Sequence, residues 1–133
     1  MKIKSFHLPF GVQVFKAFSD EARVRILHLL YVEGDLCITD IEQVLEFTQS
    51  KTSRHLSYLK AAGLTSSKRQ DAYVLHKLNN GVLQMVQQLF KYMAQDPQLE
   101  ADLQNFKVLF SNRELVASRQ KLAQQLGGGM GMD

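Results

Sequence analysis

The segment TQSKTSRHLSYLKAAGL, from Thr48 to Leu64, constrains the fold of this chain most strongly. At about 100° per residue, it reads as a helix with two unlike faces. One face is formed by small or apolar side chains, namely Thr52, Leu56, Leu59 and Ala62. The opposite face carries hydroxyls and a guanidinium, from Ser50, Ser53, Arg54 and Ser57, and is flanked by Gln49 and Tyr58. The segment therefore predicts an amphipathic helix whose outer face is polar and free of carboxylates.

The chemistry of that outer face is typical of a helix that approaches a polyanion. Ordinary exposed helices mix Glu with Lys, because the two support each other at i,i+4 spacing. Small hydroxyls let a helix enter the major groove of DNA, where Arg and Gln can hydrogen-bond to base edges. The plainer alternative is a surface helix that happens to lack acids.

Positive charge is concentrated around the same segment. Between Phe47 and Gln70 there is no acidic residue, although the formal net charge of the whole chain is only +3. The basic residues of this region are Lys51, Arg54, Lys60, Lys68 and Arg69. A local field of one sign attracts polyanions and supplies salt-dependent affinity. A solvated basic patch is one alternative, whereas an anionic membrane surface is disfavoured because no strongly apolar face lies opposite these charges.

Length and composition limit the class of protein. The 133 residues make one domain, or one domain with an extension, and an apolar content of 45% is enough for a core. No apolar run is long enough to cross a membrane, and the N-terminal segment reads as a first helix over Gly11–Phe18 rather than as a signal peptide. The single cysteine, Cys37, fits a reducing compartment. We therefore expect a cytoplasmic protein that does not contact membranes.

The residues before the central segment predict further helices. One is expected from Glu21 to Val32, with Gly34 just beyond its end. The sequence Thr39-Asp40-Ile41-Glu42 fits a capping box and predicts a short helix from Asp40 to Glu46. A short helix, a turn at Phe47-Thr48 and a second helix with a basic polar face together make a helix-turn-helix.

Two strand-like runs follow the helix-turn-helix. They cover Leu64–Arg69 and Ala72–Leu78, with Gln70-Asp71 between them. A hairpin in this position is a wing, and its tip would carry Lys68 and Arg69 towards the phosphate backbone or the minor groove. The sequence thus predicts a mainly α fold with a small β-hairpin.

From Val14 to Leu78 the chain resembles the ArsR/SmtB family of winged helix-turn-helix transcriptional repressors. The resemblance lies in VFKAFSDEARVRILHLL, DLCITDIEQVL, the Thr48–Leu64 segment and the hairpin. It implies a homodimer that binds operator DNA and often releases it when an inducer binds. The family's base-reading positions fall on Gln49, Ser50, Ser53 and Arg54, the face that the helical period selects independently. The full set of expected DNA contacts is Gln49, Ser50, Lys51, Ser53, Arg54, Ser57, Tyr58, Lys60, Lys68 and Arg69, whereas His55 is expected to be partly buried and hydrogen-bonded.

The metal sites of the family are incomplete in this sequence. Its two-thiolate site matches Cys37-Ile38-Thr39, where the second cysteine is missing, and soft metal ions need two or three sulfurs. Its site on the last helix uses histidines, but no histidine follows His76. His7 with Cys37 would supply too few ligands for zinc. We therefore expect no metal and no cofactor, and Cys37 is expected to be a small buried residue, although a redox role stays open.

The C-terminal third predicts helices beyond a minimal winged helix. Asn80–Gln95 has an apolar face too wide for a lone surface helix, and further helices are expected from Asp96-Pro97 and from Ser111-Asn112. The resemblance implies a dimer interface on the first helix and the helix after the wing, and the expected residues are Val12, Phe15, Val82, Val86, Leu89, Phe90 and Met93. An effector pocket lined by Met85, Phe90, Met93 and Phe106 is a further hypothesis. The expected division is a DNA-binding domain at 1–78, a helical dimerisation extension at 79–126 and a disordered tail at 127–133.

These observations favour a sequence-specific, DNA-binding transcriptional regulator. The expected form is a winged helix-turn-helix with extra C-terminal helices for dimerisation. It would be a homodimeric repressor on an imperfect inverted repeat, released by a small-molecule inducer and not a two-thiolate metal sensor. The alternative is a winged-helix protein-interaction module without specific DNA binding, because Asp71 stands at the wing tip where the family usually has glycine. An enzyme is not expected, since the sequence has neither a Gly-rich phosphate loop nor a nucleophile–base pairing.

Overall fold

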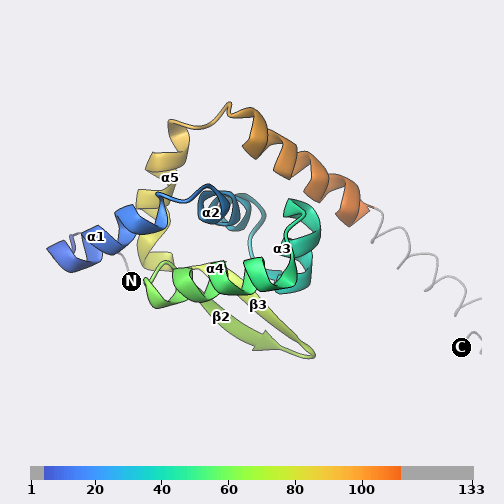
Figure 1. Cartoon of the computed structure of the whole chain (residues 1–133), viewed down its shortest axis with the longest axis horizontal. Coiled ribbons are helices and arrows are strands. Elements are labelled where there is room, and N and C mark those ends of the chain that lie inside the picture. Colours follow the sequence, from blue (N-terminus) through green and yellow to red (C-terminus); the bar gives the residue numbers. More distant parts are fainter. Residues whose placement is uncertain (1–4, 112–133) are drawn as a thin grey trace, which may run out of the picture.

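The computed structural model describes residues 5–111, which form a helical fold around a small sheet (Figure 1). The helices are α1 (Leu8–Ala17), α2 (Glu21–Glu33), α3 (Ile38–Leu45), α4 (Gln49–Ala61) and α5 (Leu83–Lys91), with a 3-10 turn, η1, at Asn80–Val82. A further helix covers residues 97–111, and we call it the C-terminal helix. The strands are β1 (Leu36–Cys37), β2 (Thr65–Gln70) and β3 (Tyr73–Leu78). The helix predicted from Ser111-Asn112 and the predicted tail lie outside the described residues, apart from Ser111 itself.

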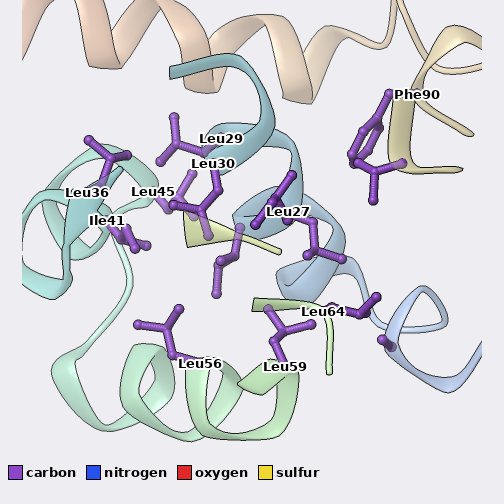
Figure 2. Close-up of a cluster of buried hydrophobic side chains, with 14 of the residues drawn as sticks. Leu27, Leu29, Leu30, Leu36, Ile41, Leu45, Leu56, Leu59, Leu64 and Phe90 are labelled. Atoms are coloured by element: carbon purple, nitrogen blue, oxygen red, sulfur yellow. The ribbon is translucent and has the colours of Figure 1, made fainter. Parts of the chain in front are cut away.

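The core is built around α2, whose side chains Ile26, Leu27 and Leu29 are fully buried. Leucines and an isoleucine of α3 and α4 surround them, and the leucine after α4 closes the cluster (Figure 2). Burying one such side chain contributes about 1.5–3 kcal/mol. The same cluster includes Val86 and Phe90 of α5, so the core continues past the wing. The division into domains at residue 78 stays a prediction.

The ends of α2 and α4 follow the signals in the sequence. Asp20 accepts a hydrogen bond from the backbone N–H of Arg23 at 3.2 Å, and Gly34 follows α2 with a φ of 86°. Thr48 caps α4 in the same way, accepting from the backbone N–H of Lys51 at 3.2 Å. Gly63 follows α4 with a φ of 83°, a region that favours glycine. These boundaries confirm the predicted start of α2, the glycine just beyond its end, and the start of α4 after the turn at Phe47-Thr48.

The predicted start of α3 was wrong. The helix begins at Ile38, so Thr39 lies inside it and the N-cap position belongs to Cys37. Pairing of Leu36 with His76 and of Cys37 with Leu75 holds the chain extended up to Cys37, and the helix begins immediately after it. The capping box therefore does not form at Thr39.

The sheet has three antiparallel strands in the order β1-β3-β2. The predicted hairpin is confirmed, with Thr65 opposite Leu78 and Gln70 opposite Tyr73. Asp71 stands in the turn with a φ of 55°, a conformation that Asp tolerates better than most residues. The third strand, β1, was not predicted, because two residues are too few to show an alternating pattern.

The C-terminal helix folds back on the helices of its own chain. Its described part lies over α2 and α3, on the side away from α1 (Figure 1). The helix predicted from Asp96-Pro97 is confirmed over residues 97–111. The helix after the wing, α5, is shorter than predicted, since it ends at Lys91. Within residues 5–111, no helix is both long and apolar enough to span a bilayer.

Candidate nucleic-acid interface

The two faces of α4 lie as the helical period predicts. Its inner face is buried, with exposed fractions of 0% for Thr52, 3% for Leu56 and 0% for Leu59. Most of the polar side chains expected to contact DNA are exposed, namely Gln49, Ser50, Ser53, Arg54, Ser57 and Lys60. Lys51 and Tyr58 are partly covered. The structure therefore provides an accessible, acid-free helix face, and the contact each residue makes with DNA stays a prediction.

The wing continues the positive surface of α4. Lys68 and Arg69 are both exposed on the outer half of β2. At the base of the wing, the Nζ of Lys60 donates a hydrogen bond to the Oγ of Ser67 at 2.9 Å. This contact joins the last turn of α4 to β2, so helix and wing present their basic groups from one connected surface.

Aromatic rings hold two cations beside α4. The ammonium of Lys51 lies 4.2 Å from the centre of the Phe47 ring, in the turn before α4. The guanidinium of Arg23 lies 4.1 Å from the centre of the Tyr58 ring. Such contacts contribute about 0.5–1 kcal/mol at exposed sites. Tyr58 is therefore part of a packed contact with α2 as well as of the outer face.

Arg23 is a residue of this region that the sequence reading did not select. Besides covering Tyr58, it donates from Nε to the backbone oxygen of Ala17 at 3.2 Å, and from its terminal nitrogen to that of Lys16 at 2.7 Å. One side chain thus contacts both the end of α1 and the C-terminal half of α4. The sequence signals were its place three residues after the helix-capping Asp20 and its position within the family-like segment VFKAFSDEARVRILHLL.

His55 on α4 and His76 on β3 are the histidines of the interface region, and burial disfavours the charged form of both rings. His55 is buried, and burial lowers its pKa, against the opposing effect of the Asp20 carboxylate, whereas the hydrogen bond expected for it stays a prediction. Burial also lowers the pKa of His76 on β3. The positive charge of the surface therefore comes from lysine and arginine.

The residues expected in the dimer interface divide into two groups. Val12 and Phe15 on α1 are exposed, by 41% and 78%. Val82, Val86 and Phe90 are buried in the core of their own chain, because the apolar face of α5 packs on α2. Leu89 and Met93 are half-buried. Of these seven residues, Val12 and Phe15 are accessible to a second copy in this conformation, and Leu89 and Met93 are partly accessible.

The sensor residues lie apart from one another. Among residues 5–111, no three histidine, cysteine or acidic side chains are grouped so that they could hold a metal ion. The thiol of Cys37 donates to the Asp40 carboxylate at 3.1 Å, and burial raises its pKa. A pocket of about 300 Å³ lies between α2 and the start of the C-terminal helix, and of the four residues expected to line an effector pocket only Met93 borders it.

Known proteins resemble the chain over this same region. A sequence model of the family described as "Bacterial regulatory protein, arsR family" matches residues 20–67. The arsenic resistance transcriptional regulator ArsR1 of Pseudomonas putida is 37% identical over 78 residues, which cover 59% of this chain and 61% of that protein. The arsenical resistance operon repressor of Bacillus subtilis is 36% identical over 75 residues, covering 53% of this chain and 71% of that repressor.

The chain belongs to the arsR family of bacterial regulatory proteins. Its fold agrees with this membership, since HlyU from Vibrio cholerae superimposes with a TM-score of 0.60 and 28% identity over 65% of this chain and 95% of that one. Membership confirms the expected family, and the winged helix-turn-helix confirms the expected fold class. It also agrees with the expectation that the chain is no enzyme, because the relatives are transcriptional regulators. The match spans 61% of the length of the Pseudomonas relative. Membership of the family therefore does not assign the activity of that whole protein to this chain.

Proposed function

We propose that this member of the arsR family is a transcriptional regulator that binds specific DNA sequences through α4 and contacts the backbone with its wing. The observation that carries the proposal is the outer face of α4. It presents Gln49, Ser50, Ser53 and Arg54 to solvent without a carboxylate, while the opposite face is fixed in the core. An α-helix fits the major groove, where Arg and Gln can discriminate between base pairs.

The acting form in this proposal is a homodimer joined through α1. Leu8, Val12 and Phe15 are exposed at i, i+4 and i+7, which makes an apolar stripe along one side of the helix. A two-fold dimer would place two α4 helices in successive major grooves. The operator would then be an imperfect inverted repeat with half-sites separated by about 10–10.5 bp or somewhat more.

The regulator in this proposal represses its genes and is released by a small inducer. The names of the relatives support the repressor part, since the Bacillus subtilis protein is an operon repressor. Metal release through two adjacent thiolates is not part of the proposal, because Cys37 is the one cysteine of the sequence. We expect the protein to act in the cytoplasm, where its DNA would be.

Selection from a random duplex library tests the proposal. The purified protein is incubated with the library at moderate salt, and bound duplexes are amplified over several rounds. The proposal predicts enrichment of one motif with inverted symmetry. It also predicts that the parent protein sediments as a dimer and that the Phe15→Ser variant sediments as a monomer. Enrichment of no motif, with weak and equal retention of all sequences, would contradict it.

One observation favours the second candidate function, a winged-helix module that binds protein instead of DNA. Asp71 is exposed in the wing turn, where its carboxylate would face the phosphates. In that case the selection enriches nothing, and Asp71→Asn leaves the retention of DNA unchanged. If the wing contacts phosphates, Asp71→Asn instead strengthens binding to every duplex.

A further inference from the structure

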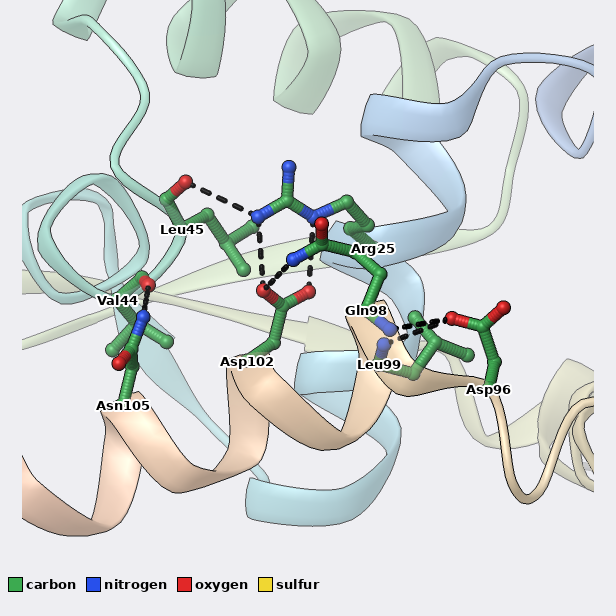
Figure 3. A network of polar contacts seen from close by, with 8 residues as sticks. All are labelled: Arg25, Val44, Leu45, Asp96, Gln98, Leu99, Asp102 and Asn105. Carbon is green, nitrogen blue, oxygen red and sulfur yellow. Dashed lines mark hydrogen bonds and ion pairs between the residues drawn. The ribbon is translucent and has the colours of Figure 1, made fainter.

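The C-terminal helix, which lies outside the winged helix-turn-helix, carries a buried carboxylate. Asp102 is only 1% exposed, and its two carboxylate oxygens accept from the Nε and a terminal nitrogen of Arg25 at 3.0 and 2.9 Å (Figure 3). The amide of Gln98 donates to the same carboxylate at 3.1 Å. The hydrogen bonds between Arg25 and Asp102 raise the pKa of the Arg25 guanidinium. The helix that supplies Asp102 lies outside residues 20–67, the part matched by the family.

The same guanidinium reaches the end of α3. It donates to the backbone oxygen of Leu45 at 3.3 Å, and Asn105 donates from its amide to the backbone oxygen of Val44 at 3.3 Å (Figure 3). The last carbonyls of a helix have no partner within the helix and need one from elsewhere. The C-terminal helix therefore caps the end of α3, just before the turn of the helix-turn-helix. Asn105 does so directly, and Asp102 does so by holding Arg25 of α2.

The contact continues through the turn to α4. The guanidinium of Arg25 lies 4.9 Å from the centre of the Phe47 ring, and the ammonium of Lys51 lies 4.2 Å from it. Asp102, Arg25, Phe47 and Lys51 thus form an unbroken series of contacts from the C-terminal helix to the first turn of α4.

We propose that the C-terminal helix positions α4 for base reading, and that Asp102 and Asn105 are the positioning residues. Neither touches DNA in this proposal, which rests on the proposed function. Asp102 acts through Arg25, and Asn105 acts through the last turn of α3. Hydrogen bonds weaken steeply when distance or angle departs from the ideal, so a small rotation of α4 reduces base contacts more than backbone contacts.

The test separates positioning from stability by two kinds of variant. In the double variant Arg25→Met/Asp102→Leu the ion pair is replaced by apolar groups, an exchange that is often neutral for stability, and the net charge of the chain does not change. Asn105→Ala removes the amide from an exposed residue and leaves the ion pair in place. Gln104→Ala, exposed on the same helix, is the matched control. Each protein is titrated with the selected duplex and with a scrambled duplex of equal composition, at a temperature where circular dichroism shows it fully folded.

The proposal predicts that the preference for the selected duplex falls by about tenfold in the double variant, roughly the value of one base contact, while affinity for the scrambled duplex stays the same. Asn105→Ala loses part of that preference, and Gln104→Ala loses none. If the role of these residues is purely structural, the variants melt at lower temperatures but keep the parent's preference for the selected duplex. The proposal would be overturned if both Asn105→Ala and a folded double variant behaved in this way. If the double variant does not fold, Asn105→Ala decides alone. Failure of the parent protein to prefer the selected duplex would instead reject the proposed function, and with it the positioning role.

Discussion

The guanidinium of Arg23 lies 4.1 Å from the centre of the Tyr58 ring while it donates hydrogen bonds to the carbonyls of Lys16 and Ala17. One side chain of α2 therefore closes the end of α1 and covers a ring on α4. The helix proposed for dimer contact and the helix proposed for DNA contact share this residue. A change at Arg23 is expected to affect both.

Arg23→Lys should lower the free energy of unfolding by about 1–2 kcal/mol, because lysine cannot donate to both carbonyls and keep its charge over the ring. Urea denaturation followed by circular dichroism measures the change. Arg54→Lys is the control, since Arg54 is exposed on the same surface and its replacement should stay within about 0.5 kcal/mol. Equal losses in both variants would show that the Arg23 contacts do not stabilise the fold.

Arg54→Ala should weaken binding to the selected operator by about 1–3 kcal/mol and relax specificity at one base pair. The reason is that Arg54 points outward from the middle of α4, where a guanidinium can form two hydrogen bonds to guanine. Titrations with operators substituted at each position measure the effect. Thermal unfolding should be unchanged, because the side chain is exposed. An Arg54→Ala protein that keeps the parent's affinity and its base preferences would mean that α4 does not read the DNA.

Lys68→Ala should weaken binding to all duplexes alike and reduce the slope of log affinity against log salt by about 1. Lys68 is exposed near the wing tip and its ammonium is expected to neutralise a phosphate. Lys91→Ala, which removes an equal charge from the last turn of α5, is the matched control and should leave the slope as it is. A slope that drops equally in both variants would indicate an effect of net charge alone.

Stability should fall as the pH is lowered from about 7 to 5.5, because buried neutral histidines bind protons less readily than the unfolded chain does. Burial lowers the pKa of His28, although the carboxylates of Asp102 and Asp96 oppose this, and Nδ1 of His28 has no hydrogen-bond partner among residues 5–111. A histidine whose pKa is lowered by folding stabilises the folded state at pH values above its pKa in the unfolded chain. This stabilisation is lost as the pH falls below that value, because the unfolded chain then binds protons more readily. His55 and His76 act in the same direction.

The variant His28→Leu should therefore show a shallower loss of unfolding free energy over the same pH range. Leucine keeps an apolar contact with Phe90, whose ring centre lies 4.9 Å from that of His28. Identical slopes in the parent and in His28→Leu would exclude a contribution from this histidine.

The sequence predicted best those features that depend on neighbouring residues. The faces of α4 follow from its helical period, and its limits follow from the cap at Thr48 and the glycine at 63. The hairpin was predicted nearly to the residue. The start of α3 was missed because a distant strand, β3, decides it by pairing with Cys37, and this pairing has no local signal.

Contacts between distant parts of the chain could not be predicted. Asp102 lies 77 residues after Arg25, and nothing in the spacing of either residue points to the other. The apolar width of α5 was correctly read as a packing surface. Whether Val86 and Phe90 pack on their own chain or on a partner depends on the tertiary arrangement, however, and the structure buries both in their own core.

The most direct test of the account is the affinity of the purified protein for the duplex upstream of its own gene, compared with unrelated duplex of equal length, at two salt concentrations. That duplex is the first candidate operator, and the selected motif replaces it if it matches another locus. The account predicts a preference of about 10³-fold or more for the operator, with both affinities falling steeply as salt rises. Equal affinity for operator and unrelated duplex at both salt concentrations would contradict the central claim that α4 reads a specific sequence.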